Sequence, residues 1–249
     1  MDRCVDGDIH LSQENLRQEK VPICLEESPK SKFYQILRNA YDRFLYPIRN
    51  TYLADYLSRF FSYKESLLDI GCAEGTIPYL ISQKKNITVH GVDVYFKSEP
   101  RIPSTRYDGY ALPFEDKQFT CTMAVDALHH CENIKGTLQE MMRVSHRIII
   151  KDHYYESGWD LFLLKLFDIS ANLPYGIKIR SNFKKWEEWE QIFKELNLGY
   201  SYVDKQMDCI KLGPIRHFCV LLEENGKGAM VLSKNKSLKN IKRECFIGV

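Results

Sequence analysis

Hydrophobic positions in the middle of the chain follow two alternating periods. Short, mostly apolar runs at residues 66–71 and 118–125 are typical of buried strands. Residues 134–145 instead repeat apolar side chains every three or four positions, as one face of a helix does. Because strands alternate with helices, the pattern predicts an α/β fold with a doubly wound, mostly parallel, seven-stranded sheet.

The same pattern gives approximate bounds for the elements. Strands are predicted at residues 66–71, 87–94, within 105–114, and at 118–125, 146–152, 200–207 and 217–225. Helices are predicted at residues 76–84, 134–145 and 184–200. The connection between the last two strands is too short for a parallel crossover, so the last strand is expected to run antiparallel.

The two ends of the chain differ in composition from its middle. Residues 1–30 are polar without clear periodicity and are expected to form a flexible arm. Residues 227–249 include a Lys-rich stretch with few large apolar side chains and are expected to form a solvated tail. Residues 31–226 are therefore predicted to form one domain.

Two helical segments are expected outside the alternating pattern. Residues 31–63 have helical spacing that Pro47 interrupts, which predicts two N-terminal helices. Residues 154–184 follow the fifth expected strand and are predicted to form a lid-like helical insert over an acceptor site. Both segments carry aromatic side chains that would line an apolar pocket. These are Phe33, Tyr34, Tyr41, Phe44, Tyr46, Trp159, Phe162, Phe167, Tyr175 and Phe183.

Bulk composition narrows the class of protein. The 249 residues are 44% hydrophobic, which suffices for a large core, and the net charge of +2 gives no global attraction to nucleic acid. Eight cysteines without a CxxC pair indicate free thiols in a reducing compartment. The polar N-terminus differs from a signal peptide, and no apolar run is long enough to span a bilayer. A cytoplasmic protein without a membrane span is expected.

A turn that contains glycine, residues 71–75, follows the first expected strand. A dinucleotide-binding turn requires glycine at its centre, because the pyrophosphate lies on the backbone. Ala73 takes that position, and Glu74 would place a carboxylate beside the phosphates. The turn therefore favours a ligand with a ribose and an amino-acid tail but no phosphate. Asp93, at the end of the second expected strand, is placed to accept hydrogen bonds from ribose hydroxyls.

Five ordered motifs resemble class I S-adenosylmethionine-dependent methyltransferases, in the metal-free branch that acts on small molecules. They are LLDIGCAEG from Leu67, VHGVDVY from Val89, DGYALPFEDKQF from Asp108, TMAVDALHH from Thr122 and LQEMMRV from Leu138. The chain departs from the family at Ala73, where glycine is usual, and lacks the family's Lys-Pro-Gly-Gly turn before the fifth strand. The resemblance implies a Rossmann-like methyltransferase fold.

The resemblance also implies an activity, namely methyl transfer from S-adenosylmethionine to an O or N atom of a small or medium organic acceptor. The transfer would be an in-line displacement with S-adenosylhomocysteine as product. The turn after the first strand would hold the methionine part, Asp93 the ribose and Asp108 the adenine. The implied cofactor-binding residues are Asp69, Gly71, Cys72, Ala73, Gly75, Asp93, Val94, Asp108, Gly109 and Asp126.

Titratable side chains gather where the fourth and fifth expected strands end. An acceptor that must lose a proton requires a general base, so the predicted catalytic residues are His129, His130, Asp152 and His153. No metal is expected in the leading interpretation. An alternative is a Mg²⁺-dependent enzyme with Asp126, Asp152 and His153 at the ion, although histidine suits Mg²⁺ poorly.

Other interpretations stay open. An RNA or protein methyltransferase would use a basic cluster formed by Lys178, Arg180, Lys184 and Lys185. A non-catalytic cofactor-binding protein would need only the ligand-binding turn. Residues 167–176 resemble the Asn-Pro-Pro-Tyr motif of amino-group methyltransferases, but they follow the fifth expected strand, whereas that motif belongs after the fourth.

Overall fold

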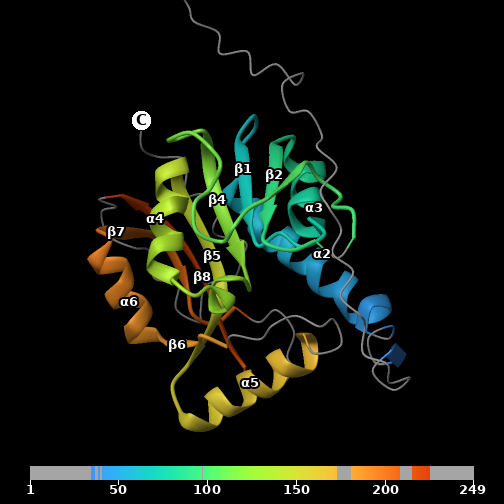
Figure 1. The fold of residues 1–249 in the computed structure, drawn as a ribbon, viewed down its shortest axis with the longest axis vertical. Helices are drawn as coiled ribbons and strands as arrows, with labels where there is room; N and C mark the ends of the chain where they lie inside the picture. The colour runs from blue at the N-terminus through green and yellow to red at the C-terminus, as the bar shows by residue number, and fades with distance from the viewer. Residues whose placement is uncertain are drawn as a thin grey trace, which may run out of the picture.

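One eight-stranded sheet runs through the molecule (Figure 1). The computed structural model describes residues 35–36, 39, 41–96, 98–172, 181–207 and 215–224. The strand order is β3-β2-β1-β4-β5-β8-β7, and β6 pairs with β5 outside this path. The strands are β1 (Ser66–Ile70), β2 (Thr88–Asp93), β3 (Ser104–Arg106), β4 (Phe119–Val125), β5 (Ser145–Tyr155), β6 (Lys184–Lys185), β7 (Leu198–Asp204) and β8 (Arg216–Glu224).

The strand directions confirm the predicted α/β fold. Strands β1 to β5 pair in parallel, whereas β8 runs antiparallel to both of its neighbours. The sheet has one strand more than predicted, because Lys184 and Lys185 pair with the end of β5 to form β6. The sequence predicted a helix from residue 184. Glu188 instead accepts a hydrogen bond from the Lys185 backbone N–H, which caps a helix that begins at Trp186.

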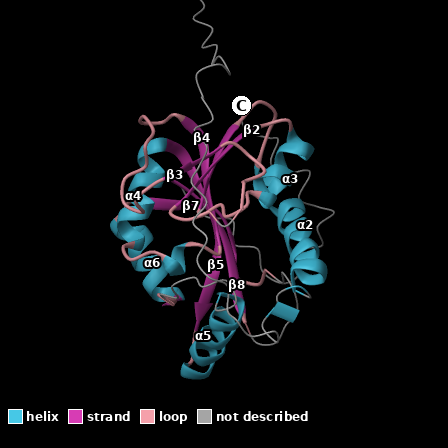
Figure 2. Ribbon diagram, turned by 45° about the vertical axis from the view of Figure 1, so that its right-hand side comes forward, coloured by secondary structure: helices cyan, strands magenta, loops and turns pink. Residues whose placement is uncertain are grey.

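Helices cover both faces of the sheet (Figure 2). Helices α2 and α3 lie on one face, α4 and α6 lie on the other, and α5 lies beyond the end of β5. Their bounds are α2 (Tyr46–Leu57), α3 (Thr76–Lys85), α4 (Ile134–Val144), α5 (Gly158–Asn172) and α6 (Trp186–Glu195). Shorter turns are η2 (Tyr41–Leu45), η3 (Ser58–Phe60) and η4 (Leu128–His130).

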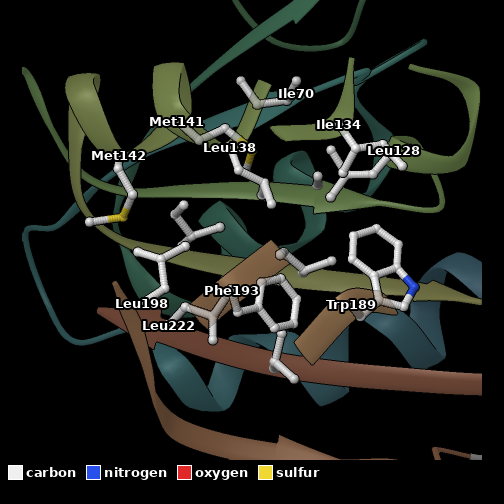
Figure 3. Packing of buried hydrophobic residues seen from close by; sticks show 14 of the residues in the cluster. Ile70, Leu128, Ile134, Leu138, Met141, Met142, Trp189, Phe193, Leu198 and Leu222 are labelled. Carbon is white, nitrogen blue, oxygen red and sulfur yellow. The ribbon is translucent and has the colours of Figure 1, made fainter. Parts of the chain in front are cut away.

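The larger core lies between the sheet and helices α4 and α6 (Figure 3). Trp189 and Phe193 of α6 and Leu138 and Met141 of α4 are at most 1% exposed. Their spacing of three or four residues places each pair on one face of its helix. Truncation of Trp189 to alanine is expected to destabilise the fold by roughly 3–5 kcal/mol. A second buried cluster packs α2 and α3 against the other face of the sheet.

The connection from α4 to β5 is direct and lacks the Lys-Pro-Gly-Gly turn that the family resemblance would suggest. Val144 ends the helix, and Ser145 begins the strand. Lys117 Nζ donates hydrogen bonds to the carbonyl oxygens of Met142 (2.8 Å) and Ser145 (3.0 Å). The last carbonyls of a helix lack partners within the helix, so this lysine stabilises the short connection.

Pro47 lies in the first turn of α2, where its missing N–H is tolerated. The preceding η2 is a π-helical turn, so the helical geometry changes next to Pro47, as predicted. The cysteines of the described part, Cys72, Cys121, Cys131 and Cys219, are free thiols. None of the helices within that part has the length and apolar character needed to cross a bilayer.

Helix α5 confirms a helical insert after β5 but corrects its predicted surface. Trp159, Phe162 and Phe167 are 66%, 53% and 40% exposed, so they do not pack into the core of the described part of the chain. The helical period instead turns Leu164 and Asp168 inward, where both are buried. Phe44, before α2, is likewise exposed, whereas Phe183 is buried. The predictions for residues 1–30 and 227–249 and for Phe33, Tyr34, Tyr175, Lys178 and Arg180 lie outside the described residues.

Candidate active site at the carboxyl ends of the strands

The turn between β1 and α3 requires glycine at both of its ends. Gly71 has a φ of +69°, and a Cβ there would lie 2.7 Å from the Cβ of Ala127. Gly75 has a φ of +68°, and a Cβ there would lie 2.5 Å from Cγ1 of Ile102. Ala73, between them, adopts a positive φ of 49°. The turn therefore presents bare backbone at the end of β1, which lets a ligand approach closely.

Cys72 contributes its backbone to the turn, while its thiol packs against the sheet. Its Sγ would lie 2.5 Å from a Cβ on Gly91 of β2, so glycine is needed there to admit the side chain. Burial, followed by the charges of Asp69 and Asp93, raises the pKa of the Cys72 thiol well above its usual range. A ligand at the turn would therefore meet the exposed Gly71 and Ala73.

Asp69 is a buried carboxyl group directly before the turn, and only 4% of it is exposed. Burial raises its pKa well above the usual range, and the nearby Asp93 carboxylate raises it further. An ammonium group placed beside Asp69 would favour its ionised form. This environment fits the predicted role of Asp69, which is to receive the ammonium of a methionine moiety.

Asp93 ends β2 beside the same turn. Its Oδ2 accepts a hydrogen bond from the Ala73 backbone N–H (2.9 Å), and its Oδ1 accepts one from that of Tyr95 (3.2 Å). These bonds orient the carboxylate next to the backbone that a ligand would contact. The position therefore fits the predicted ribose contact.

The Asp108 loop lies next to the end of β2. Asp108 Oδ1 accepts hydrogen bonds from the backbone N–H groups of Tyr110 (2.8 Å) and Ala111 (3.1 Å), which lowers the pKa of this carboxyl. Gly109 has a φ of +88°, and a Cβ there would lie 3.2 Å from Cγ1 of the exposed Val94. The loop thus brings Gly109 close to Val94, and their role at an adenosine stays a prediction.

Asp126 follows β4 and lies among basic groups. Lys151 Nζ, which is fully buried, donates to Asp126 Oδ1 at 2.5 Å, and Arg49 of α2 donates to Asp126 Oδ2. Burial would raise the pKa of Asp126, but Lys151 and the other basic neighbours outweigh burial and hold that pKa well below its usual range. Asp126 is therefore a carboxylate. Its neighbour Ala127 contacts Gly71, so this cluster adjoins the turn.

Two histidines beside Asp126 are held neutral, and both carry their proton on Nε2. Burial, followed by the Lys151 charge, lowers the pKa of His217 to about 3, and burial lowers that of His153 well below its usual range. Lys151 donates to His217 Nδ1 (3.0 Å), so the proton of His217 belongs on Nε2. His153 Nε2 lies 3.2 Å from Asp126 Oδ1, where two lone pairs would repel each other. The proton of His153 therefore belongs on Nε2, and Nδ1 is its basic nitrogen.

His129 has a different environment. Its Nδ1 lies 2.6 Å from Asp152 Oδ1, and its ring stacks on Phe183 with centroids 4.7 Å apart. Burial would lower the pKa of His129, but the Asp152 carboxylate outweighs burial and raises it. His129 thus favours the charged form, in which neither ring nitrogen can accept a proton, whereas His153 is neutral and keeps one nitrogen available.

Asp152 is fully buried, and it belongs to neither of the two groups of described residues whose possible ligand atoms lie within 4.8 Å of one another. Its Oδ2 accepts hydrogen bonds from the backbone N–H groups of Leu128 and His129, and its Oδ1 accepts one from that of His153 as well as facing His129 Nδ1. These bonds orient the η4 turn. The geometry therefore does not support the Mg²⁺ alternative built on Asp126 and Asp152, and Asp152 acts on His129.

Comparisons with known proteins agree with this geometry. Residues 68–147 match the methyltransferase domain family. These residues are therefore similar to a methyltransferase domain. The domain continues beyond the matched residues, because β5 to β8 complete the same sheet.

Solved structures share the fold of this chain at low sequence identity. A chain from the complex between the Haloferax volcanii Trm112 methyltransferase activator and the putative methyltransferase has a TM-score of 0.59 at 14% identity, covering 80% of this chain and 100% of that chain. A putative methyltransferase from Bacillus halodurans has a TM-score of 0.54 at 12% identity, covering 70% and 99%. Geranyl diphosphate C-methyltransferase from Streptomyces coelicolor, solved with S-adenosyl-L-homocysteine, has a TM-score of 0.53 at 10% identity, covering 69% and 74%. No curated protein sequence gives a significant match.

The structure adds residues to the candidate site that the sequence did not indicate. Arg49 comes from α2, Asp168 from α5 and His217 from β8, and no local motif marks any of them. Lys151 could have been noticed in the sequence, because it is a charged residue next to the apolar run of β5. Of the predicted basic cluster, Lys184 donates to Asn182 Oδ1 (2.7 Å) and therefore serves the local structure.

Proposed function

We propose that the protein transfers a methyl group from S-adenosylmethionine to an O or N atom of a small or medium organic acceptor. Bound S-adenosylmethionine supplies an activated methyl group for in-line displacement. The bare backbone of the 71–75 turn, the buried Asp69 carboxyl and the oriented Asp93 carboxylate support binding of this cofactor. Each fits one part of the molecule: the sulfur-bearing chain, the ammonium and the ribose.

The observation that carries the catalytic proposal is the pair formed by Asp126 and His153. His153 Nδ1 is buried and has no hydrogen-bond partner among the residues that the structure describes. We assign this nitrogen as the general base. As the acceptor atom attacks the methyl carbon and the carbon–sulfur bond breaks, His153 Nδ1 would take the acceptor proton. Asp126 would stabilise the resulting imidazolium through Nε2, 3.2 Å away.

The remaining polar groups support this pair. Lys151 and Arg49 keep Asp126 ionised, so it can stabilise a positive charge on His153. His217, with its proton on Nε2, offers a hydrogen-bond donor next to the base, since the two rings lie 4.4 Å apart. Asp152 is a positioning residue that orients His129 and the η4 turn, and it is not assigned a contact with the acceptor.

The proposal is tested with phenolic, carboxylate and sugar acceptors and a methyl donor that carries tritium in its methyl group. On an acceptor that the wild type methylates, His153→Gln is expected to lower kcat by at least about 100-fold. His146→Gln is the matched control, because His146 is an exposed histidine at the opposite end of β5. The base assignment is wrong if His153→Gln keeps the wild-type kcat and the wild-type dependence of kcat on pH.

A further inference from the structure

A second histidine cluster lies between the η4 turn, which follows β4, and helix α5. It consists of His129 and His130 of η4 and Asp168 of α5, with one ligand atom of each residue within 4.8 Å of the others. His129 Nε2 lies 3.9 Å and His130 Nε2 lies 3.6 Å from Asp168 Oδ1. Both separations exceed hydrogen-bond length. Ligand atoms around a tetrahedral ion with bonds of 2.0–2.2 Å are themselves roughly 3.4 Å apart, which is close to these values.

We propose that His129, His130 and Asp168 form a binding site for a divalent transition-metal ion of the Zn²⁺ type. Two imidazoles and one carboxylate are the ligand types that such ions take in proteins. Three protein ligands leave at least one coordination position for water or a small molecule. The proposal goes beyond methyl transfer and does not depend on it.

The outer contacts of the cluster favour this assignment. Asp152 holds His129 Nδ1 at 2.6 Å, so Nε2 of the same ring is directed at Asp168. Ser181 donates to Asp168 Oδ2 at 2.8 Å, and Asp168 Oδ1 faces the histidines. A carboxylate behind a ligating histidine and a hydrogen bond behind a ligating carboxylate are the usual support of protein-bound metals.

A neighbouring group with similar residue types is a poorer site for a divalent ion. Asp126, His153 and His217 also place their ligand atoms within 4.8 Å of one another. However, Lys151 Nζ lies 2.5 Å from Asp126 Oδ1 and 3.0 Å from His217 Nδ1. An ammonium group in contact with two of the three ligands would repel a divalent cation.

The side chains of the cluster are mostly buried, which suits a bound ion that solvent reaches from one side only. The side chains of His129 and Asp168 are 5% and 4% exposed, whereas that of His130 is 28% exposed. His130 therefore marks the side from which an ion would enter. Because the ligands come from η4 and α5, a bound ion would link helix α5 to the turn that follows β4.

The test uses full-length protein freed of metal with a chelator and then titrated with Zn²⁺ or Co²⁺. The wild type is expected to bind one equivalent tightly at the cluster, with visible Co²⁺ absorption of a nitrogen and oxygen site. Asp168→Asn and His130→Gln should each weaken binding at least about 10-fold, and Ser181→Ala should weaken it less. His146→Gln, an exposed histidine outside the cluster, should bind as the wild type does.

Three results would overturn the proposal: no binding of either ion at micromolar concentration, binding that Asp168→Asn and His130→Gln leave unchanged, or a strong near-ultraviolet thiolate band showing that cysteine holds the Co²⁺. Titration of each metal-free variant with S-adenosylmethionine is run alongside. Retained cofactor binding shows that a variant is folded, so loss of metal affinity is assigned to the ligands. The same titration reports on the proposed cofactor separately from the metal.

Discussion

The two halves of the site are built by different means. The proposed cofactor half, at the ends of β1 and β2, consists of backbone turns, glycines and single carboxylates such as Asp93. The proposed acceptor half, at the carboxyl ends of β4 and β5 and the start of β8, consists of buried charged and titratable side chains around Lys151 and Asp126. A half built from backbone depends on local conformation, whereas a half built from buried charges depends on every partner being present. Substitutions in the first half should therefore mainly change ligand affinity, whereas substitutions in the second should mainly change stability.

The largest effect on stability is expected in the acceptor half. Asp126→Ala would leave Lys151 buried without its carboxylate partner, which should lower the free energy of unfolding by roughly 3–5 kcal/mol. Asp55→Ala is the matched control, because it breaks an exposed ion pair with Lys84 (2.7 Å) and should change that free energy by less than about 1 kcal/mol. Chemical denaturation measures both. Equal effects of the two substitutions would contradict the claim that buried charge organises this half.

The cofactor half should respond to an added methyl group. Gly71→Ala would force a Cβ to 2.7 Å from Ala127 at a positive φ, so the strain should be about 1–3 kcal/mol and the turn should shift. Affinity for S-adenosylmethionine is expected to fall at least about 10-fold, since a 1.4 kcal/mol loss is tenfold. Gly158→Ala is the control, because a Cβ there would meet nothing within 4 Å. Calorimetry that finds equal affinity in both variants would refute the close approach at Gly71.

Removal of one charge from the proposed cofactor half should have an effect that is confined to binding. Asp93→Asn keeps the shape of the side chain but weakens the hydrogen bonds expected from a ribose by about 1.5–3 kcal/mol, or roughly 10- to 150-fold in Kd. His153→Gln in the acceptor half should leave this Kd near that of the wild type. If His153→Gln weakens cofactor binding as much as Asp93→Asn does, the two halves are not separate.

The acceptor half should also make stability depend on pH. His153 and His217 have pKa values below the unfolded value of about 6.5, so the unfolded chain binds protons that the folded chain excludes. Their contribution to stability is complete above pH 6.5 and falls as the pH decreases toward about 3, the pKa of His217. The slope is at most about 1.4 kcal/mol per pH unit for each histidine.

The pH effect is checked by denaturation of the wild type and His217→Gln between pH 7 and pH 4. The variant should lose part of the slope, because glutamine does not titrate. The raised pKa of His129 adds stability that is lost only as the pH rises above 6.5, so it does not affect this window. An unchanged slope in His217→Gln would show that His217 is not held neutral in the folded protein.

How far the sequence predicted the molecule follows the same division. The alternation of strand and helix periods and the 71–75 turn are local signals, so the parallel sheet and the placement of Gly71, Asp93 and Asp108 could be predicted. Arg49 lies 77 residues from Asp126, and His217 lies 66 residues from Lys151. Pairings across such distances leave no periodic trace, so the acceptor half became visible only once the strands were ordered in the sheet.

The aromatic residues of α5 show a second limit of sequence patterns. Composition suggested an apolar pocket, but the position of each side chain on the helix decides whether it faces inward. The buried Leu164 and Asp168 lie four residues apart, while the exposed Trp159 and Phe162 lie on the outer face. The period of the helix was readable from the sequence, but the face that packs against the sheet was not.

The most direct test of the central claim is a calorimetric titration of the purified protein with S-adenosylmethionine, S-adenosylhomocysteine and NADH. The account predicts one equivalent of each adenosyl-sulfur compound, weaker binding to Asp93→Asn and Gly71→Ala, and no binding of NADH. Binding of NADH together with no response to either adenosyl-sulfur compound at millimolar concentration would contradict it.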